Sequence, residues 1–406
     1  MLKRCVVVGL ASVWVLMAGL AVCAQEKAGS PQRVAIRAAR LIDGKSEAVV
    51  SNAVVLVEGE KITAVGSGLA IPADARVIDL GDATLLPGLI DAHTHLLLEI
   101  DGAATSQQTE ILRIVATQST AERTLLGAKM AREVLEAGIT TVRDLGNSGV
   151  NGDVALRTAI ERGWLPGPRM VVSTRALAAQ GGQFGRVTPE AQKLIEEEYV
   201  TIRGAESARQ AVRQALYDGA NCITVIVNGT PANVTLEELK AIVEIAHAAG
   251  AKVAAHAIGD KATRIAAEAG VDSIEHAFTV PDDVLKIMAE KHILLVPNDG
   301  TVQTLTEKVF GTRQPSTEER TRVEKRIQRS VERLQERLRR AKKMGVPIAA
   351  GSDSSLMIPG KNRGQISLLV YEAYAQAGMT PMEIIQAATR NAAELLGMQD
   401  RIHRMT

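Results

Sequence analysis

The 406-residue chain has few aromatic residues, few cysteines and almost no net charge. Aromatic residues make up only 2% of the sequence, so extended stacking surfaces for bases or sugars are not expected. The formal net charge of +1 gives no electrostatic reason to expect a nucleic-acid partner or an anionic membrane surface. What the chain does have is length and a globular composition, enough for one large domain and a small accessory layer.

The first 24 residues have the pattern of a secretory signal peptide. Lys3 and Arg4 give a charged start, an apolar run covers residues 5–20, and small residues lead up to Ala24, where cleavage is expected. A membrane anchor is the alternative, but the run is short for a span of about 20 residues. We therefore expect a periplasmic or secreted protein with no stable membrane span after cleavage. Cleavage would leave Cys222 without a disulfide partner.

Two regions of different periodicity follow. Residues 25–83 contain short apolar runs separated by turn residues, which predicts the N-terminal part of a small, incomplete β-sandwich module. Across residues 84–397, apolar runs alternate with helical stretches. This order favours an α/β fold of the (β/α)8 TIM-barrel type over an open doubly wound sheet, because no G-x-G-x-x-G follows the first strand. The eight barrel strands are expected to begin at Thr84, Thr140, Arg169, Asn221, Lys252, Ser273, Ile293 and Pro347.

Long segments follow several of the predicted strands. Residues 96–120, 175–204 and 298–315 are loops of a length that is usually functional, and they would lie at the face where barrels keep their active sites. Residues 316–344 are dense in Glu and Arg. Their alternating signs predict a solvated barrel helix and not a nucleic-acid patch.

Histidines and one aspartate stand where predicted strands end. His93 and His95 close the first strand, and side chains two residues apart on a strand share a face, so this pair can hold one divalent metal ion. His256 and His276 end two successive later strands, and Asp353 follows the eighth. All five are expected to meet at one mouth of the barrel. The remaining histidines are expected to be structural or solvent-facing: His247, His292 and His403.

Several motifs in this order resemble the amidohydrolase superfamily, in its imidazolonepropionase and prolidase-like (Xaa-Pro dipeptidase-like) branch. The similar region extends from Val34 to Asp400. Its motifs are Pro-Gly-Leu-Ile-Asp-Ala-His-Thr-His at 87–95, Gly-Ile-Thr-Thr-Val-Arg-Asp at 138–144, His-Ala at 256–257, Ser-Ile-Glu-His at 273–276, Ala-Gly-Ser-Asp at 350–353 and Ala-Thr-Arg-Asn-Ala-Ala at 388–393.

The resemblance implies a metal-dependent hydrolase of C–N bonds, such as a dipeptidase, a carboxypeptidase or an N-acyl amino-acid amidohydrolase. Zinc is the expected metal, one ion per chain, held by His93, His95, His256 and Asp353, with His276 beside it as a further ligand or as the group that polarises the scissile carbonyl. Asp353 would take a proton from the metal-activated water and return it to the leaving nitrogen. An ester or lactone hydrolase and a degenerate metal-binding barrel without turnover are the alternatives.

The chain departs from the family at strand four. Two-metal members carry a carboxylated lysine there, and the equivalent position is Thr224, which cannot form a carbamate. A single ion is therefore expected, with two ions as the alternative. Cys222 and Glu275 are not expected to replace the lysine, because Cys222 lies two residues too early and Glu275 alternates away from His276.

A substrate carboxylate would need a cation in the pocket. Arg143 and Asp144, at the end of the second strand, are expected to pair with each other and brace the mouth. Full-length relatives continue into strands that complete the β module, whereas residues 398–406 form a short tail here, so exposed strand edges and a compensating homo-oligomer are expected. The candidate anchors for a small-molecule or dipeptide-like substrate are Arg175, Arg186, Lys361 and Arg363.

Overall fold

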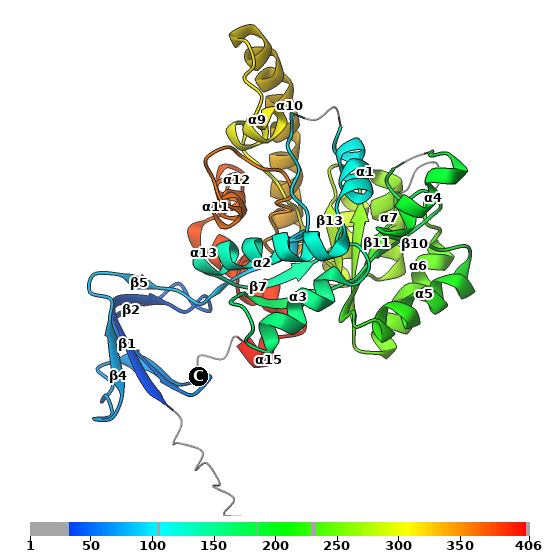
Figure 1. Cartoon of the computed structure of the whole chain (residues 1–406). Helices are drawn as coiled ribbons and strands as arrows, with labels where there is room; N and C mark the ends of the chain where they lie inside the picture. The colour runs from blue at the N-terminus through cyan, green and yellow to red at the C-terminus, as the bar shows by residue number, and fades with distance from the viewer. Residues whose placement is uncertain (1–31, 104–105, 185, 229–232, 403–406) are drawn as a thin grey trace, which may run out of the picture.

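The computed structural model describes residues 32–103, 106–184, 186–228 and 233–402 (Figure 1). The predicted signal segment and His403 lie outside these ranges. Among the residues described, no helix has both the length and the apolar character needed to cross a membrane.

A small β module precedes the barrel and lies at its lower left in Figure 1. Its strands follow the order β3-β2-β1-β4, with β5 added beside β1. The hairpin between the first two strands turns at Asp43, whose carboxylate accepts hydrogen bonds from the backbone N–H groups of the next turn residues. The strands are β1 (Arg33–Ile42), β2 (Val49–Glu58), β3 (Lys61–Ser67), β4 (Arg76–Asp79) and β5 (Thr84–Leu85).

The first barrel strand begins later than expected. Thr84 lies in β5 and pairs with Arg40 of β1, so it belongs to the small module. Pro87 has no backbone N–H to donate to a ladder, which separates β5 from the barrel strand that begins at Leu89.

Parallel strands form the barrel wall in two sheets. One has the order β6-β7-β8 and the other the order β10-β9-β11-β12-β13-β14. The expected eighth strand is reduced to a bridge between Ile348 and Leu295, and the Ala92 N–H donates to the carbonyl of Ala350, so this segment connects the two sheets. The strands are β6 (Leu89–Thr94), β7 (Ile139–Asp144), β8 (Arg169–Val172), β9 (Ala176–Ala178), β10 (Tyr199–Thr201), β11 (Cys222–Ile226), β12 (Lys252–Ala257), β13 (Ser273–His276) and β14 (Leu294–Val296).

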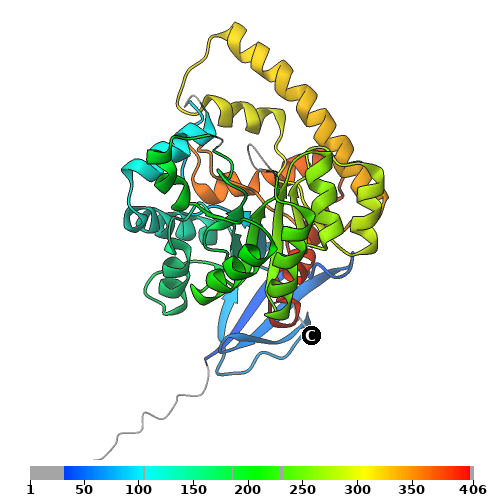
Figure 2. The ribbon, with the colours of Figure 1, turned by 90° about the vertical axis from the view of Figure 1, so that its right-hand side faces the viewer.

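Helices surround the strands, as the two views show (Figures 1 and 2). The acidic and basic segment predicted to be one helix is the 27-residue α10, which extends beyond the barrel body. The helices that follow the barrel strands are α2 (Thr120–Glu136), α3 (Gly152–Glu161), α5 (Ala205–Tyr217), α6 (Leu236–Ala248), α7 (Asp260–Ala269), α8 (Asp282–Glu290), α10 (Thr317–Lys343), α11 (Arg363–Leu368), α12 (Val370–Gln376), α13 (Pro381–Ala387), α14 (Arg390–Leu395) and α15 (Gln399–Ile402).

The three long loops carry short elements of their own. The first holds α1 (Gln107–Thr117) and the third holds α9 (Val302–Phe310). The second, residues 175–204, contains β9, β10 and the short helix α4 (Gln192–Glu196). All three lie at the end of the barrel where the strands finish, so they are placed to cover the mouth.

Alternation along the strands divides the core into an inner and an outer layer. On β12, Val253 and Ala255 pack outward against the helices, whereas Ala254 packs inward with Cys222 and Val296. His256 follows the inward series and therefore faces the barrel interior.

Candidate metal centre

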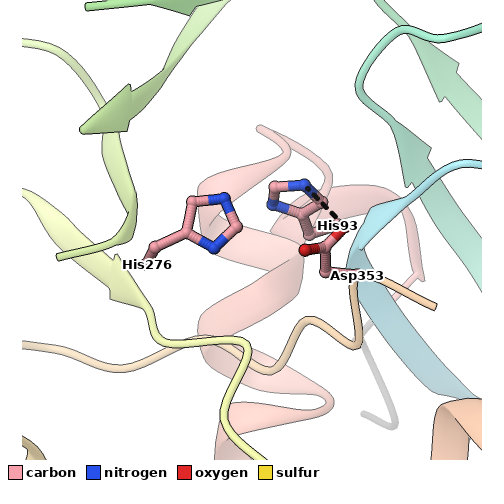
Figure 3. Close-up of side chains that lie close together, drawn as sticks. All are labelled: His93, His276 and Asp353. Carbon is pink, nitrogen blue, oxygen red and sulfur yellow. Dashed lines mark ion pairs between the residues drawn. The ribbon is translucent and has the colours of Figure 1, made fainter. Parts of the chain in front are cut away.

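The five residues predicted to converge do lie together at the mouth of the barrel. His95 Nε2 is 3.2 Å from Asp353 Oδ1, and His93 Nε2 is 3.7 Å from the same oxygen. The ring centroid of His276 lies 5.2 Å from that of His93 and 4.5 Å from that of His256. Figure 3 shows the imidazole of His276 and the carboxylate of Asp353 directed toward His93.

Backbone conformations that are uncommon for side-chain-bearing residues direct two of these groups. His276 has φ of 69° and Asp353 has φ of 47°, both in the left-handed region. Such conformations cost roughly 1–3 kcal/mol each and concentrate at functional sites. The Asp353 N–H donates to the carbonyl of His93, 2.9 Å away, which fixes the end of the eighth strand segment against the end of β6.

Glu275 corrects one expectation. It was expected to point away from His276, but the left-handed turn at His276 interrupts the alternation, and both side chains reach the barrel interior. Glu275 is fully buried, and its Oε2 lies 2.8 Å from His93 Nδ1. The His93 N–H donates to this carboxylate, which leaves His93 Nε2 free to act as a ligand.

Arg143 and Asp144 do not pair with each other, contrary to expectation. Arg143 instead donates to Glu275 Oε1 at 2.8 Å and to the carbonyl of Ala92 at 2.6 Å. Asp144 accepts from the backbone N–H of Leu96 and from the hydroxyl of Ser148. Side chains of successive strand residues point to opposite faces, so each residue braces the mouth through its own partners.

The electrostatics favour the neutral form of two of the four imidazoles, His256 and His276. Burial lowers the pKa of His276 to about 4, and burial together with the nearby His276 lowers the pKa of His256 well below its usual value. Burial also opposes protonation of His95, but its hydrogen bond to Asp353 outweighs this and raises its pKa to about 9. In Asp353, burial is likewise outweighed, by His95 and the other histidines, and the carboxyl pKa is held far below its usual value.

The donor set fits a divalent ion of the zinc type. Ligand atoms of His93, His276 and Asp353 lie within 4.8 Å of one another, and imidazole nitrogen with carboxylate oxygen is the combination that catalytic zinc sites use. Thr224 faces the same cavity from β11, and its buried hydroxyl has no hydrogen-bond partner among the described residues. The residues therefore offer imidazole and carboxylate ligands for a divalent ion, and the strand-four position has threonine in place of a lysine that could be carboxylated.

A cavity of about 200 Å³ opens beside these groups. Two of the long loops form much of its wall, which is consistent with the expectation that they are functional. Apart from the five predicted residues and Glu275, its lining is Gln107, Gln108, Ile111, Leu145, Asn147, Ala176, Gln183, Phe184, Tyr199, Thr224, Ile226, Ile258, Phe278 and Ser355.

Gln183 is a site residue that sequence reasoning missed. Its amide nitrogen lies 3.0 Å from His256 Nε2, and Tyr199 donates its hydroxyl to the Gln183 amide oxygen at 3.0 Å. Burial raises the pKa of Tyr199, so this hydroxyl stays protonated. The length of the loop was the available signal, but nothing in the sequence distinguished these two side chains from their neighbours.

None of the four candidate carboxylate anchors lines the cavity. Arg175 donates to the carbonyl of Glu196 within its own loop, and Arg186 and Lys361 are exposed. Arg363 is buried, and it donates to the carbonyl of Leu98.

Two of the three remaining histidines face solvent, as expected. His247 lies 2.7 Å from an Asp272 oxygen and His292 lies 2.8 Å from a Glu394 oxygen, with 42% and 60% of their side chains exposed. Both are therefore outside the metal centre.

Comparison with known proteins shows the family to which the chain belongs. Residues 84–404 match the amidohydrolase family, and the chain belongs to that family. Its members have the TIM-barrel fold and are generally metal-dependent, and the chain's place in the imidazolonepropionase and prolidase-like branch follows from the relatives below.

Two curated relatives and one solved structure illustrate the similarity. The ochratoxinase of Aspergillus niger is 29% identical over 403 residues, covering 90% of this chain and 76% of the relative. The imidazolonepropionase of Fusobacterium nucleatum is 26% identical over 391 residues, covering 88% and 83%. A Xaa-Pro dipeptidase solved with bound methionine is 27% identical with a TM-score of 0.75, covering 92% and 91%. Such homologues are hydrolases acting on C–N bonds.

Proposed function

We propose that this protein hydrolyses an amide C–N bond of a small molecule and that it requires one divalent ion, zinc, for this reaction. The observation that carries the proposal is the convergence of four histidines and Asp353 at the strand ends, beside a cavity. His93, His95, His256 and Asp353 would hold the ion, with His276, whose ring nitrogen lies within 4.8 Å of ligand atoms of His93 and Asp353, beside it as a further ligand or as the group that polarises the carbonyl. When bound, the ion supplies Lewis acidity, which eases deprotonation of water and polarises a carbonyl group.

Asp353 is the group proposed to move the proton. Its carboxylate is 29% exposed, so one side faces the cavity, while the His95 ring contacts the other. A carboxylate here accepts the proton of the attacking water at an Oδ atom and later delivers it to the nitrogen of the departing amine. The hydrogen bond from His95 and the positive charge around it hold Asp353 in its ionised form before the reaction.

His276 is proposed to stabilise charge on the carbonyl oxygen. Because its pKa is about 4, it is neutral near pH 7 and donates one N–H. A neutral donor fixed at the mouth stabilises the oxyanion that forms as the carbonyl is attacked. Its left-handed backbone places this donor on the cavity side of β13.

Elemental analysis of the purified protein, combined with an amide-hydrolysis screen, tests the proposal. We expect one zinc ion per chain, and loss of hydrolysis when a chelator removes it, with recovery on adding zinc back. The screen covers dipeptides, N-acyl amino acids and neutral aryl amides, with aryl esters in parallel.

Each outcome has a defined meaning. Turnover of esters without any amide would favour the ester-hydrolase alternative. A folded protein that takes up no metal even after reconstitution would overturn the proposal and leave a degenerate barrel. Two ions per chain would show that a ligand other than a carboxylated lysine bridges them.

A further inference from the structure

Three of the nine aromatic residues of this chain line the cavity. The sequence has only three phenylalanines and four tyrosines, yet Phe184, Phe278 and Tyr199 all line this one site. Phe184 and Tyr199 pack edge to face, with ring centroids 5.3 Å apart and an interplanar angle of 72°. Phe278 packs edge to face against His276, with ring centroids 5.5 Å apart, and 41% of its surface is exposed. An exposed phenylalanine beside a polar centre offers a surface for an apolar group.

The cavity has no free cationic side chain among its described lining residues, because the cationic His95 is already paired with Asp353. Glu275 and Asp353 contribute carboxylates, and no lysine or arginine is among its described lining residues. The internal segments left undescribed, residues 104–105, 185 and 229–232, contain no lysine or arginine in their sequence. A carboxylate on a substrate would therefore enter this cavity without an ion-pair partner from the protein, and burying an unpaired charge is unfavourable.

The polar groups of the cavity wall include neutral amide side chains, which can form hydrogen bonds with a substrate. The Gln183 amide, held by the Tyr199 hydroxyl, reaches the edge of the site at His256. Gln107, Gln108 and Asn147 add further amides to the wall. Amides of this kind recognise uncharged carbonyl and N–H groups.

We propose that the substrate of this site is a small uncharged amide whose aromatic ring packs against Phe184, Tyr199 and Phe278. This inference rests on the proposed function and narrows it to one substrate class. The cavity of about 200 Å³ is smaller than the roughly 300–1,000 Å³ of pockets that enclose drug-sized ligands, so one ring with its amide is a suitable size.

Two cations near Asp353 define the competing arrangement. Lys308 of α9 and Arg363 of α11 both act electrostatically on this carboxylate, and Arg363 Nη1 is buried without a hydrogen-bond partner among the described residues. Neither side chain lines the cavity. If a substrate carboxylate were bound, these two residues would have to receive it.

A matched set of acetamides separates the two arrangements. 4-Acetamidobenzamide and 4-acetamidobenzoate have the same size and the same scissile acetamide, and they differ in the charge of the distant substituent. trans-4-Acetamidocyclohexanecarboxamide keeps the apolar bulk and the distant carboxamide and replaces the aromatic ring with a cyclohexane ring. Acetate release by the zinc-loaded protein gives kcat/KM for each, and calorimetry with the same zinc-loaded protein gives their affinities independently of turnover.

We expect kcat/KM for the benzamide to exceed that for the benzoate by about tenfold or more, which corresponds to one lost charge-compensating contact of about 1.4 kcal/mol. Phe184→Leu and Phe278→Leu should lower the ratio of benzamide to cyclohexyl turnover, because they remove ring contacts and keep apolar volume. Tyr199→Phe should retain that ratio, since the ring remains.

The opposite preference would overturn the inference. Stronger binding of the benzoate, abolished in Lys308→Gln, would place the substrate carboxylate at the cation pair. Equal affinities, or no binding of either ring compound, would equally contradict an aromatic, uncharged substrate. If the compounds bind with the expected preference and none is hydrolysed, the inference on ligand class holds while the proposed hydrolysis fails for these amides.

Discussion

The metal centre and the cavity wall beside it are built in different ways. The proposed ligands lie at the ends of parallel strands, where backbone hydrogen bonds place neighbouring residues such as His256 and Glu275 opposite each other. The wall comes from loops, where Phe184 and Gln183 are held mainly by side-chain contacts with Tyr199. From this difference we expect the proposed chemistry and the choice of substrate to depend on separate sets of residues. Changes at the strand ends should affect turnover and metal, and changes in the wall should affect KM and preference.

The largest effect is expected at the strand ends, from Asp353→Asn. The amide cannot accept the proton, and general-base groups contribute about 10²- to 10⁴-fold to rate, so kcat should fall by that range with little change in KM. Steady-state kinetics on an amide found in the screen measures this. Asp283→Asn, at an exposed pair with Arg264, is the matched control and should keep full activity. A variant at 353 with near-normal kcat would show that another group takes the proton.

A smaller but still large effect is expected from Glu275→Gln, because Glu275 contacts the proposed ligand His93 and is not itself a proposed ligand. His93 loses the carboxylate that orients it, and such losses reduce metal affinity or activity by about 10- to 100-fold. Arg143 is also left buried without its carboxylate partner, so the free energy of unfolding should decrease. Zinc titration against a competing chelator and thermal unfolding report the two losses.

The control for this variant is Glu244→Gln, which removes an exposed pair with Arg209 on the outer helices. It should change neither zinc affinity nor stability measurably. Unaltered zinc affinity in the Glu275 variant would mean that His93 is oriented by its packing alone.

In the wall, Tyr199→Phe should raise KM by about 2- to 10-fold, because it removes one neutral hydrogen bond to Gln183 worth about 0.5–1.5 kcal/mol. Zinc content should be unchanged, because Tyr199 belongs to the cavity wall and is not a proposed metal ligand. Tyr217→Phe is the control, since that side chain is 86% exposed. A loss of zinc in the Tyr199 variant would break the separation between the two regions.

The smallest effect is expected away from both regions, from His247→Gln. This histidine is an exposed partner of Asp272, and surface substitutions usually change stability by less than about 0.5 kcal/mol. Zinc content and kcat should match the wild-type protein. A fall in zinc content would show that metal binds outside the strand-end cluster.

The cluster at the strand ends could be predicted because the position of each residue, directly after an apolar run, shows where it lies in the fold. His93, His95 and Asp353 follow apolar runs, and the C-terminal ends of barrel strands meet at one mouth. The role of Glu275 was not predictable from alternation, because the left-handed backbone of His276 interrupts the period of two. Thr84 was assigned to the barrel because apolar runs before and after Pro87 look alike in sequence.

The wall was predicted only as a set of long loops. The tertiary fold brings Phe184 and Tyr199 of one long loop to the cavity together with Phe278 of a distant segment, and no local pattern in the sequence encodes that contact. The cations expected in the cavity lie elsewhere for the same reason, because a loop's sequence does not say which side of it faces the substrate. The length of the loops indicated which segments form the cavity wall, and the packing of their side chains determines which residues line it.

The position of Arg143 between the two sheets affects how the barrel unfolds. From β7 in the smaller sheet it reaches Glu275 on β13 in the larger one, and the proposed metal ligands are likewise divided between the two sheets. A bound ion would link the two sheets in addition to this arginine, across a wall whose hydrogen-bond ladder is interrupted. At a free metal concentration about 100 times the dissociation constant, binding would add about 2.7 kcal/mol to the free energy of unfolding of the entire domain. Chelation should therefore lower the melting temperature of the barrel as a unit, and metal supply would set the lifetime of the folded protein.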